Sequence, residues 1–275
     1  MRSILEIQDP PIDLHTMMPL ETVYADDCDF FSTDKHAHEK AATKIEKKIG
    51  EWDLIVNKDK TEYTDINIAE DKNMRGLEAW RKSKCLGSML CSIADMKNRM
   101  VLANMAYSNF KRIWIYGKQI KMPTKIKLYE AIVVPIVIYN SNSWALPRKE
   151  ENKIDAWHRN HLRQILKKTY PIKLTNEELY NIAQVRPISE RVKKYRWDML
   201  GKVLRSPENS PAYCSLIYAI NSTSKSTTKL KGRVGRPQTN LLDLIENDLL
   251  TKGLELLDLE SIKEIARNKT VWEKL

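Results

Sequence analysis

Two adjacent acids, Asp26 and Asp27, stand in the segment TVYADDCDFF (22–31) between two short apolar runs. The runs are β-branched and aromatic, which favours a short β-hairpin with both acids at its tip. Ionised carboxylates repel each other, and burying them unpaired costs free energy. A hairpin tip that carries both acids is therefore suited to binding a cation.

The cation that fits such a pair is a divalent ion that prefers oxygen ligands, such as Mg²⁺ or Mn²⁺. In polymerase chemistry, two such ions flank the transferred phosphoryl group and stabilise the attacking and leaving oxygens. The alternative is a solvated Asp-Asp turn, because Asp is common in turns and needs no ligand there. The acid pair alone favours the alternative.

The elements that would position these acids form an α/β layer. Residues 1–21 show no period, contain three prolines and are expected to form an irregular lead-in. Apolar residues at helical spacing predict a helix over 35–52. Two strands are predicted after it, at 54–56 and 61–68, separated by a turn.

Beyond about residue 90 the pattern becomes almost wholly helical. Thr175 and Glu178 fit a capping box that opens a short helix at 176–183. Residues 221–237 are polar, without acids, and are interpreted as a linker. Apolar periodicity predicts further helices over 93–114, 124–139 with a kink at Pro135, 150–168, 188–203, 239–252 and 261–275. The predicted fold class is α+β, dominated by helices.

The composition is that of a basic globular protein. Lys and Arg exceed Asp and Glu by 46 to 36, which gives a formal charge of +10 and favours a polyanionic partner such as nucleic acid. Many basic proteins have no such partner, so charge alone does not establish nucleic-acid binding. The four cysteines form no C-x-x-C pair, which favours a reduced, intracellular protein. The most apolar run, 131–139, is too short to span a bilayer, so we expect no membrane association.

The segment Tyr24-Ala25-Asp26-Asp27 reads YADD and resembles the catalytic hairpin of reverse transcriptases. Similar segments follow in the family's order: WDLIVNKDKTEY resembles L-x-x-N-x-x-KT, KCLGSML resembles the YLG primer-grip hairpin, and RMVLANMAYSNFKRIW resembles the thumb helix. Later matches include KIKLYEAIVVPIVIYNSNSWAL, RWDMLGKVLR, GRVGRPQTNLLDLIENDL and the terminal VWEKL. This ordered series, over residues 20–275, is characteristic of non-LTR (LINE-type) retrotransposon reverse transcriptases.

The resemblance implies a role for each matched residue. Asp26 and Asp27 would bind the Mg²⁺ or Mn²⁺ of an RNA-directed DNA polymerase, and Tyr24 would pack near the primer terminus. Lys60 would lie near the phosphates of the incoming nucleotide, where its charge offsets that of the leaving group. Leu86 and Gly87 would form the turn that grips the primer. Lys60 and Gly87 also have an ordinary interpretation as turn residues.

The chain departs from the family's pattern in ways that predict inactivity. The family's third carboxylate comes from an upstream strand, and no matching motif lies among the 23 residues before Tyr24. The two-metal site is then incomplete, and we expect the chain alone to be inactive as a polymerase. Single positions differ too: Cys85 replaces a Tyr, Asn142 a Glu, Lys202 a His and Leu241 a Trp.

Three segments concentrate positive charge: 99–127, 186–205 and 225–236. Such segments bind the phosphate backbone through Lys and Arg and stack bases on aromatic rings, or they are simply solvated helix faces. The residues assigned to a nucleic-acid surface on this ground are Arg99, Lys111, Arg112, Arg191, Lys194, Arg196, Arg233 and Arg236.

The predicted organisation is an irregular lead-in at 1–21, a partial palm at 22–90, a helical thumb at 91–170 and a basic helical region at 171–275. The predicted function is that of a truncated reverse transcriptase, with an RNA template and DNA primer as partners and nuclear and cytoplasmic residence. The alternatives are a basic nucleic-acid-binding fragment without catalysis and a product without function.

Overall fold

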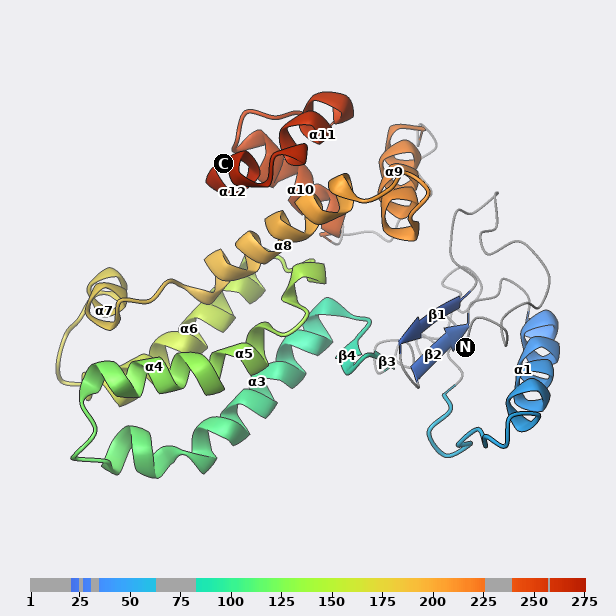
Figure 1. Ribbon diagram of the computed structural model, residues 1–275. Helices are drawn as coiled ribbons and strands as arrows, with labels where there is room; N and C mark the ends of the chain where they lie inside the picture. Colours follow the sequence, from blue (N-terminus) through green and yellow to red (C-terminus); the bar gives the residue numbers. More distant parts are fainter. Residues whose placement is uncertain (1–20, 25–26, 31–34, 63–82, 226–238, 257) are drawn as a thin grey trace, which may run out of the picture. The chain divides into compact units, whose positions relative to one another are not determined.

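A computed structural model describes residues 21–24, 27–30, 35–62, 83–225, 239–256 and 258–275 (Figure 1). The described residues of 1–87 and 206–227 form one compact unit, and those of 88–205 and 228–275 form a second. Helices dominate both units, and the described strands form two small two-stranded sheets. The prediction of a helix-dominated α+β fold is confirmed.

The predicted hairpin around the acid pair is present in the first unit. Strand β1 (Glu21–Tyr24) pairs with β2 (Asp27–Phe30) in antiparallel register, and Tyr24 lies opposite Asp27. The helix predicted next is α1 (Lys35–Gly50).

The predicted strand at 54–56 is wrong. These residues follow α1 without forming a strand, and the side chain of Ile55 is 94% exposed. A short apolar run becomes a strand only when a partner supplies its hydrogen bonds. Most of the intended partner, 61–68, lies outside the described residues, as does the lead-in at 1–20.

Helix α9 (Pro211–Lys225) also belongs to the first unit and was not predicted. Its last residues are Ser, Thr and Lys, which led to the interpretation of 221–237 as a linker. Residues 221–225 are helical, and 226–237 lie outside the described residues.

The second unit contains the predicted series of helices. They are α3 (Ser92–Asn109), the π-helical turn η2 (Arg112–Tyr116), α4 (Met122–Ile132), α5 (Val134–Ile138), the 3₁₀ turn η3 (Ser141–Ser143), α6 (Arg148–Ile165), α7 (Asn176–Ala183), α8 (Ile188–Arg205), α10 (Leu241–Leu250), α11 (Leu259–Arg267) and α12 (Lys269–Lys274). The region predicted as one helix at 261–275 is divided between α11 and α12 at Asn268, whose side chain caps α12.

Local sequence signals explain two helix boundaries. Pro135 lies in the first turn of α5, where its missing N–H is tolerated, and it separates α4 from α5 as expected. At α7, the Thr175 hydroxyl accepts from the backbone N–H of Glu178, and the Glu178 carboxylate accepts from the backbone N–H of Thr175. The predicted capping box is confirmed.

The core of the second unit lies among α3, α4, α5, α6 and α8, and includes fully buried Tyr129, Ile154 and Leu162. Helix α6 packs against both α7 and α8, so the structure has no division at residue 170. Figure 1 shows α6 and α8 running beside each other. The predicted thumb and the start of the predicted C-terminal region therefore share one core.

Two histidines of α6 are enclosed in this core. The His158 ring is stacked 5.9 Å from that of Tyr129, and its Nε2 lies 3.9 Å from the Glu130 carboxylate. The His161 ring is stacked 4.0 Å from Tyr107, and its Nδ1 lies 3.2 Å from the Tyr129 hydroxyl. Burial lowers the pKa of His158 to about 3 and that of His161 to about 4. Both rings are therefore neutral in the folded protein at neutral pH.

The C-terminal half of α8 packs against α10, α11 and α12. The rings of Trp197 and Trp272 are stacked 4.1 Å apart, and each indole N–H donates to the backbone carbonyl of the other residue. Gly201 lies against this pair: a Cβ placed on it would be 2.4 Å from Nε1 of Trp272. The absent side chain of Gly201 is what allows α12 to approach α8 this closely.

Candidate nucleic-acid interface

Strands β1 and β2 flank the acid pair. Tyr24 and Asp27 face each other across the ladder, and the Tyr24 side chain is 68% exposed. Asp26 lies outside the described residues. Within the described part of the chain, no group of three or more His, Cys, Asp or Glu residues is arranged to hold a metal ion.

Lys60 lies in a turn that its own sequence motif builds. The Asn57 side chain accepts hydrogen bonds from the backbone N–H groups of Asp59 and Lys60, and the Thr61 hydroxyl donates to the Asn57 carbonyl at 2.8 Å. Lys58 forms an ion pair with Glu46 of α1 at 2.8 Å, which ties the turn to the helix. The N-x-x-K-T pattern therefore specifies a local conformation, with Lys60 exposed to solvent.

Leu86 and Gly87 connect β3 (Lys84–Cys85) to β4 (Ser88–Met89), as the primer-grip resemblance predicts. Both have positive φ, 48° for Leu86 and 75° for Gly87. A two-residue connection with both φ values positive matches the twist of a hairpin. The Cys85 thiol donates to the Asp29 carboxylate at 3.0 Å, which links β3 to β2 within the first unit.

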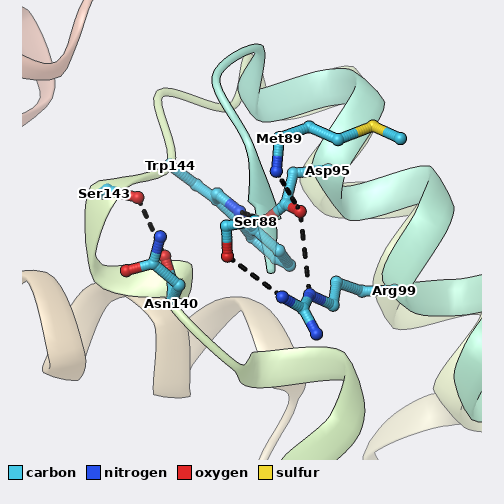
Figure 2. Close-up of polar contacts among 7 residues, drawn as sticks. All are labelled: Ser88, Met89, Asp95, Arg99, Asn140, Ser143 and Trp144. Carbon is cyan, nitrogen blue, oxygen red and sulfur yellow. Dashed lines mark hydrogen bonds and ion pairs between the residues drawn. The ribbon is translucent and has the colours of Figure 1, made fainter. Parts of the chain in front are cut away.

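Within the second unit, one buried carboxylate of α3 holds strand β4. Asp95 of α3 accepts from the backbone N–H of Met89 and from the Trp144 indole N–H, both at 2.9 Å (Figure 2). Arg99 lies 3.6 Å from the same carboxylate and donates to the Ser88 hydroxyl at 3.0 Å. Asp95 is 1% exposed, so its charge depends on these three partners.

We expect Asp95→Asn to lower the free energy of unfolding by about 2 kcal/mol, because it removes one acceptor and leaves Arg99 with a weakened partner. Urea unfolding followed by tryptophan fluorescence measures the loss. The matched control is Asp59→Asn, an exposed aspartate in the turn beside Lys60, which we expect to change stability by less than about 0.5 kcal/mol. Equal midpoints for the two variants would show that the Asp95 contacts contribute little.

A cluster of exposed cations lies where α3, η2 and α4 follow one another. It contains Lys111, Arg112, Lys118, Lys121 and Lys127, which we call the basic end. No acid occurs from Met96 to Tyr129. Lys125 is the exception among the lysines, because it is buried and donates to the Trp114 carbonyl at 3.0 Å. Figure 1 shows the chain reversing direction here between α3 and α4.

Three arginines assigned to the nucleic-acid surface have internal partners instead. Arg99 is buried beside Asp95, and Arg196 is 2% exposed and donates to Asp248 at 2.7 Å. Arg191 lies 2.6 Å from Glu130. A carboxylate neutralises each of these charges, so we remove all three from the predicted surface.

The chain was compared with family models, curated proteins and solved structures. No family model, curated protein or solved structure matches this chain.

The structure describes three of the five other residues assigned to the nucleic-acid surface. Lys111, Arg112 and Lys194 are exposed, as a phosphate-binding role requires. Arg233 and Arg236 lie outside the described residues. In the described part of the chain, no helix is both long enough and apolar enough to cross a membrane.

A second basic site, which we did not predict, lies between the end of α6 and the start of α7. A pocket of about 430 Å³ is lined by Arg163, Lys168, Tyr170 and Lys173, and the Tyr170 side chain is 93% exposed. The signal was present in the run RQILKKTYPIK, which interleaves cations with an aromatic residue. The run begins in the last turn of α6, where the apolar spacing predicts a helix but does not indicate a basic pocket.

Proposed function

We propose that the chain is the C-terminal part of a LINE-type reverse transcriptase and that its helical second unit binds a template–primer duplex by the phosphate backbone. The observation that supports this most directly is the basic end. Its five exposed cations lie within a stretch of the chain that contains no acid, so no neighbour in sequence neutralises them. Exposed Tyr116, in the same turn of chain, adds an aromatic surface.

Binding by such a surface is largely independent of sequence. Lys and Arg neutralise phosphates and release condensed counterions, so the affinity falls steeply as salt rises. The ordered resemblance series assigns the same segment to the thumb of a polymerase, which holds a duplex by its backbone. Sequence and surface chemistry thus favour the same partner.

The parent activity would be RNA-directed DNA polymerisation. Asp26 and Asp27 would hold Mg²⁺ or Mn²⁺, and such ions would stabilise the charge that develops on the transferred phosphoryl group. The hairpin register and the turn that presents Lys60 are compatible with these roles. We propose backbone binding by the helical unit as the property to test first, and primer extension as the test of the polymerase role.

The alternative function is that of a basic nucleic-acid-binding fragment without catalysis. It requires only the exposed cations of the basic end. The two proposals share the binding surface and differ in the role of the hairpin.

Duplex binding tests the shared part. Fluorescence anisotropy with an RNA–DNA duplex, measured over a salt series, should give an affinity that falls roughly 100-fold between 50 and 200 mM salt. We expect Lys111→Gln/Arg112→Gln to reduce the salt slope by about 2, because each lost phosphate contact removes about one counterion.

The matched control is Lys44→Gln/Lys47→Gln, which removes two exposed lysines of α1 and the same net charge. A slope that changes equally in both pairs would show that net charge, rather than the basic end, governs binding. Primer extension with Mg²⁺ or Mn²⁺ distinguishes the polymerase from the fragment without catalysis. Incorporation that Asp26→Asn abolishes would overturn the expected inactivity and establish the polymerase.

A further inference from the structure

A second pocket of the helical unit, of about 340 Å³, lies between η3 and α8. One wall comes from the short segment after α5 and includes Asn140, Ser141 and Asn142. The opposite wall is one face of α8, where Tyr195, Asp198 and Lys202 follow one another at helical spacing. We call this the η3–α8 pocket.

The η3 wall is held in place by the core beneath it. Asn140 has a left-handed backbone with φ of 54°, and its carbonyl accepts from the Ser143 hydroxyl at 2.9 Å. Trp144 directly follows η3, is 1% exposed and donates to Asp95 (Figure 2). The wall is therefore fixed before any ligand binds, which lowers the entropic cost of binding.

Ser141 places a hydroxyl without a partner in the wall of the pocket. Its side chain is 1% exposed, and among the described residues its Oγ has no hydrogen-bond partner. Buried hydroxyl groups are almost always paired, because leaving one unpaired is unfavourable. The hydroxyl is covered in this structure, so a polar atom of a ligand would become its partner only after the Ser141 side chain rotates toward the pocket.

The lining groups select a planar, polar ligand. Two amides and a carboxylate offer both donors and acceptors, which is the pattern that the edge of a nucleobase presents. Tyr195 supplies a partly exposed aromatic ring and Met199 an apolar contact. The pocket volume is at the small end of the range for ligand sites, which suits one base. Lys202 is exposed, and its ammonium group can bind a neighbouring phosphate.

Asn142 and Lys202 are 60 positions apart in the sequence and line the same pocket. The amide of Asn142 and the ammonium group of Lys202 are both compatible with a polyanionic ligand.

We propose that the η3–α8 pocket binds one unstacked nucleobase of a single-stranded nucleic acid. This proposal rests on the proposed function, in which nucleic acid is the partner. It adds a pocket that binds a base to the basic end, which binds the phosphate backbone. The single strand would cross α8 with its phosphate near Lys202 and one base directed between Tyr195 and Ser141.

Two measurements test the pocket. Anisotropy compares a single-stranded oligonucleotide with its abasic counterpart of equal length and charge. We expect the base-bearing strand to bind about tenfold tighter, because one base stacks and pairs in the pocket. Tyr195→Ala and Ser141→Ala should remove most of this difference while leaving the abasic strand unaffected. Tyr218→Ala, which removes an exposed tyrosine of α9, is the matched control and should preserve it.

The second measurement is independent of backbone binding. Saturation-transfer NMR with adenosine, guanosine, cytidine or uridine should show transfer from the protein to at least one base, and Tyr195→Ala should abolish it. Failure with all four nucleosides overturns the proposal. Transfer to a nucleoside without any preference for base-bearing over abasic strands would make the pocket a site for free nucleotides and overturn the single-strand proposal.

The basic end is tested separately. Lys111→Gln/Arg112→Gln could leave the salt slope of duplex binding unchanged while Tyr195→Ala removes the preference for base-bearing strands. That result would contradict the proposed role of the basic end and support the pocket.

Discussion

Lowering the pH from 7 to 4 is expected to destabilise the helical unit by about 5 kcal/mol through His158 and His161 alone. A domain of this size is usually stable by only about 5–15 kcal/mol. We therefore expect a large part of the unit's stability to disappear in mildly acidic buffer.

The direction of this effect follows from the lowered pKa values. In the unfolded chain a histidine has a pKa near 6.5, whereas burial lowers the pKa to about 3 for His158 and about 4 for His161. Between these values the unfolded state binds protons that the folded state does not bind. The stability contributed by the neutral rings is full above pH 6.5 and is lost as the pH falls toward 4.

The neighbours of His158 explain why protonation is not accommodated. Burial is the main cause of the lowered pKa, and the positive charge of Arg191 adds to it. Glu130 lies 3.9 Å away and would favour the charged ring, but its carboxylate is already paired with Arg191. Tyr129 and Tyr180 contribute neutral rings beside it.

Urea unfolding between pH 7 and 4.5 measures the effect, with His158→Phe and His158→Gln as variants that cannot titrate. Both should have a flatter stability–pH curve than the natural chain, whatever their stability at pH 7. His36→Gln removes an exposed histidine of α1 and serves as the control, with an unchanged curve. If the curves of all the variants coincide, protonation of His158 does not drive acid unfolding.

What the sequence could predict was local. Apolar periodicity located the helices, and the Thr175–Glu178 capping box and Pro135 marked their boundaries, because each of these signals acts within a few residues. The hairpin at the acid pair was predictable for the same reason. The strand at 54–56 failed because a strand requires a partner, and periodicity contains no information about partners.

The candidate site was predictable only in part, because burial and pairing arise from contacts that are distant in sequence. Arg196 meets Asp248 across 52 positions, and a count of charges along the chain treats both as solvated. The η3–α8 pocket forms from two segments that are distant in sequence, and neither segment alone indicates a pocket. Lys111 and Arg112 are exposed, and no acid lies near them in the sequence.

Gly201→Ala is expected to lower the free energy of unfolding by about 3 kcal/mol, although alanine is the better helix former by about 1 kcal/mol. The added Cβ would lie 2.4 Å from Nε1 of Trp272 and 2.9 Å from Cε2 of the same indole. The indole cannot move aside without giving up its stack on Trp197 and the two hydrogen bonds between these residues.

The matched control is Gly50→Ala at the end of α1, where a Cβ meets no atom within 4 Å and the backbone has no positive φ. We expect this variant to keep its stability. Near-ultraviolet circular dichroism adds a specific measurement, because stacked indoles give a signal that Gly201→Ala should reduce in the folded protein. A stable Gly201→Ala variant that retains this signal would mean that α8 and α12 can separate at little cost. Glycine inside a helix would then be incidental at this position, whereas the contacts of Trp272 indicate that it sets the distance between the two helices.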